Sequence, residues 1–164
     1  MRTIKFRGKK PTNGVWVYGS LVYSNEFDAA IYFQTGSGLV KSMEWVYVNP
    51  KTVCQFTGFL DKNGKEIYEG DVLRSDEYPY SCIGDKALDN YYAVVYYCEE
   101  GACFGIVTVK NPNSSVAGIS DGILDDVERE KMKNFEVVGN IHEAMWQQYG
   151  EYFKTEEGTE ADND

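Results

Sequence analysis

The sequence has little of what enzyme sites commonly need. His142 is the only histidine in 164 residues, so one chain cannot offer a pair of histidine ligands to a metal or relay a proton between two imidazoles. It has no phosphate-binding loop ending in Lys-Ser/Thr and no Gly-x-Gly-x-x-Gly fingerprint. We therefore predict no catalytic residue, no metal site and no cofactor.

Long apolar runs and clustered cysteines are also missing. No hydrophobic stretch approaches the 18 residues of a membrane-spanning helix, and the start lacks the apolar segment of a secretory signal, which predicts a cytoplasmic protein without membrane contact. The four cysteines contain no Cys-x-x-Cys pair. Cys98 and Cys103 flank a predicted hairpin tip, so they are either ordinary reduced thiols or a pair close enough to bridge.

Positive charge is scarce in the second half of the chain. Residues 1–75 carry 10 Lys and Arg against 7 Asp and Glu, whereas residues 76–164 carry 6 against 19. The net charge of -10 disfavours wholesale binding to a nucleic-acid backbone. Residues 151–164, with 6 acids and one Lys, are too polar to pack and predict a flexible tail.

What is abundant is aromatic and β-forming. Tyr alone contributes 13 residues, and alternating apolar and polar positions predict strands. The strands are expected near 2–7, 15–23, 29–34, 43–48, 52–60, 67–74, 91–98, 103–110 and 135–140. A turn at Asn13-Gly14 should join the first two as a hairpin, and a short helix is expected near 123–133 or 141–149.

Four blocks of the chain resemble the YopX family. They are IKFRGK (4–9), WVYGSL (16–21), VCQFTGFLDKNGKEIYEGD (53–71) and FEVVGNIHE (135–143). The resemblance implies a mainly β protein of a phage, a prophage or a related mobile element in a bacterial host, with an SH3-like barrel in its second half and no known reaction. The family usually has Tyr where this chain has His142, so no family role carries over to that histidine.

These expectations divide the chain into an N-terminal β region (1–50), an SH3-like barrel region (51–150) and the acidic tail (151–164), with 1–150 forming one compact unit. Several residues of the matching blocks serve the backbone. Asn63 and Gly64 favour a tight turn, and Gly70 permits a sharp change of direction before Asp71 accepts hydrogen bonds from turn amides. The structural set is Gly58, Asn63, Gly64, Tyr68, Gly70, Asp71, Gly139 and Asn140.

Two surfaces are candidates for binding. The basic start lies beside Trp16 and could follow a single-stranded backbone while rings stack on bases, or it could be a solvated strand face that guards an edge. Its residues are Arg2, Lys5, Arg7, Lys9, Lys10 and Trp16. Tyr91, Tyr92, Tyr96 and Tyr97 share one predicted strand and would either expose an aromatic patch to a partner or be buried under the 75–90 loop.

We therefore expect a non-enzymatic accessory protein that binds a phage or host protein or a second copy of itself. Two alternatives remain open. One is a nucleic-acid-binding role for the basic face, and the other is an enzyme centred on His142 with Glu66, Glu69 or Asp71. If copies associate, the basic start of one could also meet the acidic second half of another.

Overall fold

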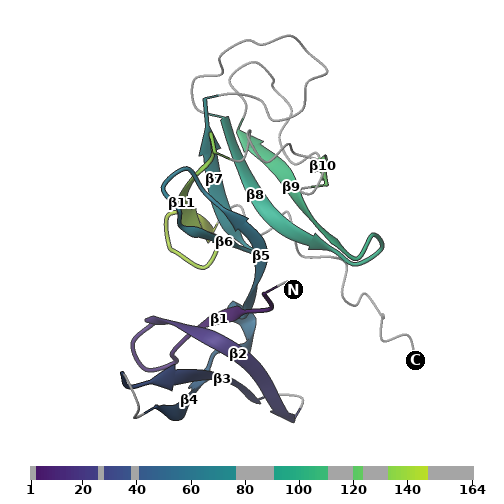
Figure 1. Ribbon diagram of the computed structural model, residues 1–164. Helices are drawn as coiled ribbons and strands as arrows, with labels where there is room; N and C mark the ends of the chain where they lie inside the picture. Colours follow the sequence, from purple (N-terminus) through teal and green to yellow (C-terminus); the bar gives the residue numbers. More distant parts are fainter. Residues whose placement is uncertain are drawn as a thin grey trace, which may run out of the picture. The chain divides into compact units, whose positions relative to one another are not determined.

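The protein is mainly β, as the sequence predicts. The computed structural model describes residues 3–25, 28–37, 41–76, 91–110, 120–123 and 133–147. Strands β1 to β11 form two antiparallel sheets in this part of the chain (Figure 1). Contacts divide the chain into two units, with residues 1–60 and 64–69 in unit 1 and residues 61–63 and 70–164 in unit 2. The expected boundary at residue 50 falls within unit 1.

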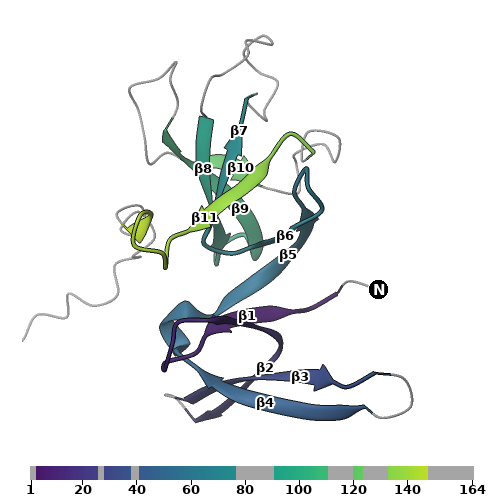
Figure 2. The same cartoon turned by 90° about the vertical axis from the view of Figure 1, so that its left-hand side faces the viewer.

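Unit 1 is built on a six-stranded sheet with the order β4-β3-β2-β1-β5-β6. Figure 2 shows β1 to β4 running alongside one another. The strands are β1 (Phe6–Lys9), β2 (Trp16–Asn25), β3 (Asp28–Thr35), β4 (Ser42–Val48), β5 (Cys54–Leu60) and β6 (Glu66–Tyr68). The predicted hairpin at Asn13-Gly14 is confirmed, because β1 and β2 pair antiparallel and Gly14 has a positive φ of 68°.

A short 3-10 helix, η1 (Pro50–Thr52), leads from β4 into β5, the strand that pairs with β1. The Asn49 side chain accepts a hydrogen bond from the Lys51 amide, and Pro50 supplies the fixed φ that suits the first turn. Thr52 Oγ1 then accepts from the Lys9 amide. As a result β5 lies beside β1, on the side opposite β2.

The two faces of the unit 1 sheet differ in chemistry. One face buries a hydrophobic core centred on Val17, Ala29, Ile31 and Val48. Gly19 lies so close to β3 that an added Cβ would be 2.0 Å from the Tyr32 carbonyl oxygen, so no larger residue fits there. Because strand side chains alternate, the residues between these positions face the other way and carry the aromatic and basic side chains.

Unit 2 repeats the strand order of unit 1. Its sheet has the order β10-β9-β8-β7-β11, in which four consecutively paired strands are followed by a fifth that returns to the first, as in β4-β3-β2-β1-β5. The strands are β7 (Asp71–Ser75), β8 (Tyr91–Cys98), β9 (Cys103–Lys110), β10 (Ser120–Ile123) and β11 (Glu136–Asn140). The SH3-like closure of this half stays a prediction.

Residues 141–146 form turns where the sequence predicts a helix over 141–149, and 3-10 geometry is reached only at residue 147. Asn140 Oδ1 accepts the His142 amide, and the Glu143 and Trp146 amides bond carbonyls three residues earlier. This spacing makes successive turns, which bring Trp146 onto Gly139, where an added Cβ would meet the indole. Most of the other expected helix, the 77–90 part of the long loop and the acidic tail lie outside the described residues.

Candidate binding surface

The basic residues at the start of the chain lie on the face of the unit 1 sheet opposite its core. Arg7 is paired with Tyr18 and Lys9 with Trp16 across the β1–β2 ladder. Lys5 lies two residues before Arg7, just as Arg7 lies two residues before Lys9. In an extended chain this spacing places all three cations on the same face of the sheet. We call Lys5, Arg7, Lys9, Trp16 and Tyr18 the cation–aromatic ladder.

Arg7 occupies the middle of this ladder and is buried. Its side chain lies between two rings, with Cζ 4.4 Å from the Trp16 ring centre and 4.5 Å from that of Tyr68. Arg7 is only 4% exposed. A guanidinium stacked on two aromatic faces is held by their negative quadrupoles, so this residue of the predicted nucleic-acid set stabilises the sheet.

Lys5 is paired with an acidic residue. Its Nζ lies 2.6 Å from Glu66 Oε2, and the Tyr68 hydroxyl donates to the same oxygen at 2.7 Å. Partial burial raises the pKa of Glu66, but the hydrogen bonds from Lys5 and Tyr68 and the Lys5 charge outweigh it, so the pKa lies below its usual value. Burial, with the hydrogen bond to Glu66, raises the pKa of Tyr68.

Glu66 therefore adds a pH-dependent contribution to stability. Because its folded-state pKa is lowered, the contribution is present above the unfolded-state pKa and is lost as the pH falls through the folded-state value. We expect Glu66→Gln to lower the free energy of unfolding by less than about 1 kcal/mol at pH 7, since the pair is partly exposed. Urea unfolding at pH 7 and pH 3 should show this difference shrinking in acid, and a difference that grows in acid would contradict it.

The remaining basic residues are less enclosed. Lys9 Nζ lies 5.0 Å from the Trp16 ring centre, and Lys10 is half-buried, while Arg2 lies outside the described residues. The structure thus brings Lys5, Arg7, Lys9 and Trp16 together as the sequence suggested. Arg7 and Lys9 already contact aromatic rings, and Lys5 is paired with Glu66. A phosphate would have to compete with these contacts.

A second group of aromatics continues along this face at the edge of the sheet. Tyr32 of β3 stacks on Trp45 of β4 at 6.2 Å, and Trp45 meets Tyr47 edge-on at 5.0 Å. Met43, Trp45 and Tyr47 are 63%, 50% and 51% exposed. We call Tyr32, Met43, Trp45 and Tyr47 the aromatic edge.

Sequence reasoning placed a strand here but missed the aromatic edge. The available signal was the alternation Met43-x-Trp45-x-Tyr47, which puts three large apolar side chains on one face. Without the sheet order that face could equally have been the buried one. Only the packing of Val46 and Val48 into the core shows that the aromatic residues face outward.

The tyrosines of β8 do not form one patch. Tyr91 is fully buried and its ring lies 6.5 Å from that of Phe135. Tyr92 and Tyr96 point to the other side of the strand, where they pack against the cluster of Val72, Val94, Val107 and Val109. Tyr97 is 41% exposed and contacts Phe104, so it is the member of the set most open to a partner.

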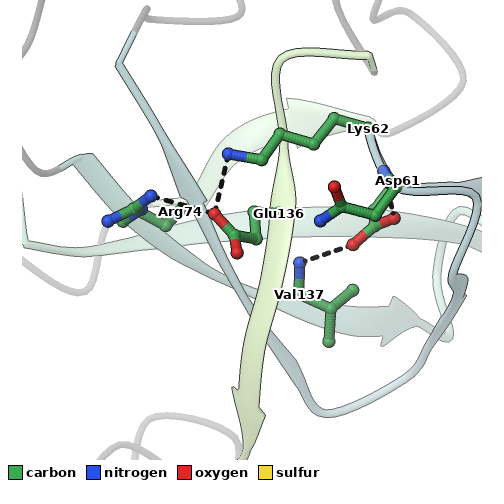
Figure 3. A network of polar contacts seen from close by, with 6 residues as sticks. Asp61, Lys62, Arg74, Glu136 and Val137 are labelled. Carbon is green, nitrogen blue, oxygen red and sulfur yellow. Dashed lines mark hydrogen bonds and ion pairs between the residues drawn. The ribbon is translucent and has the colours of Figure 1, made fainter.

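The residues of the longest matching block organise the backbone in both units. Asp61 is buried, and its carboxylate accepts from the amides of Asn63 and Val137 (Figure 3). Figure 3 also shows Glu136 between Lys62 and Arg74. Glu136 Oε2 lies 2.7 Å from Lys62 Nζ and 2.9 Å from Arg74 Nη2. These two cations lower the pKa of Glu136, the Lys62 hydrogen bond contributing most. Gly58, Gly64 and Gly70 all have a positive φ.

Asp71 and Asn140 form a buried polar pair in unit 2. Asn140 Nδ2 donates to Asp71 Oδ1 at 3.2 Å, and Asp71 and Asn140 are 1% and 2% exposed. The sequence had suggested turn amides as the partners of Asp71. A side-chain amide from β11 was not foreseeable, because β11 pairs with β7 across more than sixty residues of chain.

The described residues offer no cluster of three or more His, Cys, Asp or Glu that could hold a metal ion. Glu69 is partly buried, and burial raises its pKa against the effect of a backbone hydrogen bond involving Gln55. The half-buried His142 donates its amide to Asn140. Asn140 thus lies between Asp71 and the backbone amide of His142 and is hydrogen-bonded to both.

Two sequence features acquire a structural context. Cys98 and Cys103 are thiols paired directly across the β8–β9 hairpin.

Gly118, Ser120 and Gly122 form the Gly-x-Ser-x-Gly pattern of hydrolases, which sequence reasoning overlooked. In hydrolases that serine sits on a turn between a strand and a helix, whereas Ser120 begins β10 and pairs with Val107.

Comparisons with known proteins give a family and a distant structure. Residues 5–145 match the family described as YopX protein. A crystal structure of protein EF1440 from Enterococcus faecalis is similar with 18% identity and a TM-score of 0.48, over 89% of this chain and 99% of that one. The comparison with curated proteins finds no match. Within the described ranges, no helix is long and apolar enough to cross a membrane.

Proposed function

Because the chain belongs to the YopX protein family, we propose that it is a phage- or prophage-encoded accessory protein of the bacterial cytoplasm that binds a protein partner or itself. The aromatic edge is the observation that carries this proposal. Three large side chains, each at least half exposed, project from consecutive outward positions of one strand. Exposed aromatic clusters of this kind are typical of surfaces that become buried on association.

The chemistry of the face favours a protein over a nucleic acid. Binding to single strands needs cations that can reach phosphates beside rings that can stack on bases. The rings are present, but Arg7 is buried and Lys5 is neutralised by Glu66. A protein partner does not need these cations to leave their present contacts, because it can cover Trp45 and Tyr47 by apolar contact alone.

Removing two rings of the aromatic edge should weaken partner binding strongly. We expect Trp45→Ala combined with Tyr47→Ala to lower affinity at least about 30-fold, the effect of losing one strong aromatic anchor. The measurement is quantitative capture by tagged protein from lysogenic cells, including capture of an untagged second copy. Tyr23→Ala is the matched control, because Tyr23 is exposed in β2 at a core-face position of the same sheet.

Two results would contradict the proposal. Equal capture by the double variant and the wild type would place binding elsewhere, and Tyr97→Ala in the same assay tests the β8 tyrosines as that place. Recovery of nucleic acid alone, with an affinity for oligonucleotides that falls with salt and requires Lys9 and Lys10, would favour the nucleic-acid alternative.

A further inference from the structure

The outer edge of β4 differs from the other sheet edges in the described part of the chain. The edge strands β6, β10 and β11 have 3, 4 and 5 residues, and the pairing of each with its neighbour contains a register shift. β4 has 7 residues and pairs with β3 through consecutive partners without a shift. Short length and bulges are the usual means of preventing edge-to-edge pairing, and β4 has neither.

The sequence of β4 also lacks the side chains that normally protect an edge. SMEWVYV contains no proline, no glycine and no lysine, and Glu44 is its only charged residue. Glu44 accepts a hydrogen bond from the Thr35 hydroxyl of β3 at 2.7 Å. Its carboxylate is therefore drawn toward the neighbouring strand of its own sheet, away from the outer edge.

We propose, on the basis of the binding role argued above, that the occupant of this edge is a second copy of the chain. The two β4 strands would pair antiparallel about a twofold axis perpendicular to the sheet. Each strand then supplies the backbone donors and acceptors that the other lacks on its outer side. The contact is isologous, so it closes as a dimer and does not propagate into a fibre.

Self-complementarity selects the register. A twofold axis of this kind keeps the faces of the two sheets aligned, so only residues of the same parity can be opposite each other. Centring the pair on Trp45 uses all seven residues and sets Met43 against Tyr47 of the second copy. Glu44 then lies opposite Val46. Moving the centre to Glu44 would oppose that residue to itself, which is unfavourable, and moving it to Val46 would leave Ser42 and Met43 without partners in the second β4 strand.

This register also joins the two aromatic edges into one surface. Trp45 of each copy would meet the other across the axis, flanked by Tyr47 on the outer face. Cross-strand aromatic pairs are among the most stabilising in sheets. Because the contact consists of backbone hydrogen bonds and apolar side chains, the dimer should persist at high salt, unlike a contact of the basic start with an acidic region.

Cysteine cross-linking tests the register. In a background with Cys82, Cys98 and Cys103 changed to Ser, we expect a mixture of Met43→Cys and Tyr47→Cys proteins to form a disulfide-linked dimer on mild oxidation. Either protein alone should cross-link at least tenfold less, because identical positions lie about 13 Å apart in this register. Equal cross-linking of the mixture and the single proteins would overturn the proposed register.

Sedimentation over a concentration series tests the dimer itself. We expect Trp45→Lys to raise the dissociation constant at least 100-fold, since it removes the central ring and opposes two like charges. Tyr23→Lys should leave the constant within about twofold. A wild-type protein that stays monomeric while Trp45 and Tyr47 still govern capture of another protein would overturn the dimer and spare the proposed function, whereas loss of both would refute both.

Discussion

Replacing Arg7 with alanine is expected to lower the free energy of unfolding of unit 1 by about 3 kcal/mol. The guanidinium lies 4.4 and 4.5 Å from the ring centres of Trp16 and Tyr68 and is almost completely buried. Alanine would remove both cation–ring contacts and leave a cavity between the rings. The measurement is hydrogen exchange of peptides covering β1 and β5, together with urea unfolding.

Two variants separate this effect from loss of charge alone. Lys9→Ala removes a half-exposed cation that contacts one ring, so it should cost less than about 1 kcal/mol. Arg7→Lys keeps the charge but cannot fill the space between two rings with a planar group, so it should restore only part of the loss. If Arg7→Ala cost no more than Lys9→Ala, the buried sandwich would not be a major source of stability.

Changing Asn140 to aspartate should destabilise unit 2 by about 3 kcal/mol at neutral pH. The substitution replaces the amide that donates to Asp71 with a second carboxylate at the same buried place. Two adjacent carboxyls cannot both ionise without repulsion, so the pKa of one of them should rise in the folded state. The variant should therefore recover stability as the pH falls through that raised value toward the unfolded-state pKa near 4.

Urea unfolding between pH 4 and pH 8 measures this recovery. Asn140→Ala is the control, because it also loses the hydrogen bonds to Asp71 and to the His142 amide but adds no charge. Its stability relative to the wild type should change less with pH. If Asn140→Asp lowered the free energy of unfolding by the same amount at pH 4 and at pH 8, repulsion between the two carboxylates would not be the cause.

The positions of most strands could be predicted because half-buried strands impose an alternation that the sequence displays directly. MEWVYV and YYAVVYYC were identified in this way, and β4 and β8 occupy nearly those ranges. The return of β5 to β1 and of β11 to β7 could not be predicted, since pairing between distant segments leaves no local pattern. Strand β10 was missed because Ser120–Ile123 is short and contains a glycine.

The binding candidates show the same limit. The sequence identified the basic start and Trp16 as neighbours, but the identity of the residues did not show whether the cations face phosphates or rings. Tyr68, which completes the Arg7 sandwich, is sixty-one residues away and was assigned only a backbone role. The aromatic edge was not singled out at all, because its significance depends on β4 being the last strand of its sheet.

By itself the sequence determined the β class, the turns and the family, because alternation, turn residues and block spacing are local properties of the chain. Tertiary structure alone decided which residues are buried and which strand is left at an edge. Arg7 became a core residue and Trp45 a surface residue through contacts with segments far away in the chain. Burial and edge position depend on how the strands assemble into sheets. That assembly is determined, in each unit, by the packing of many side chains from distant parts of the chain.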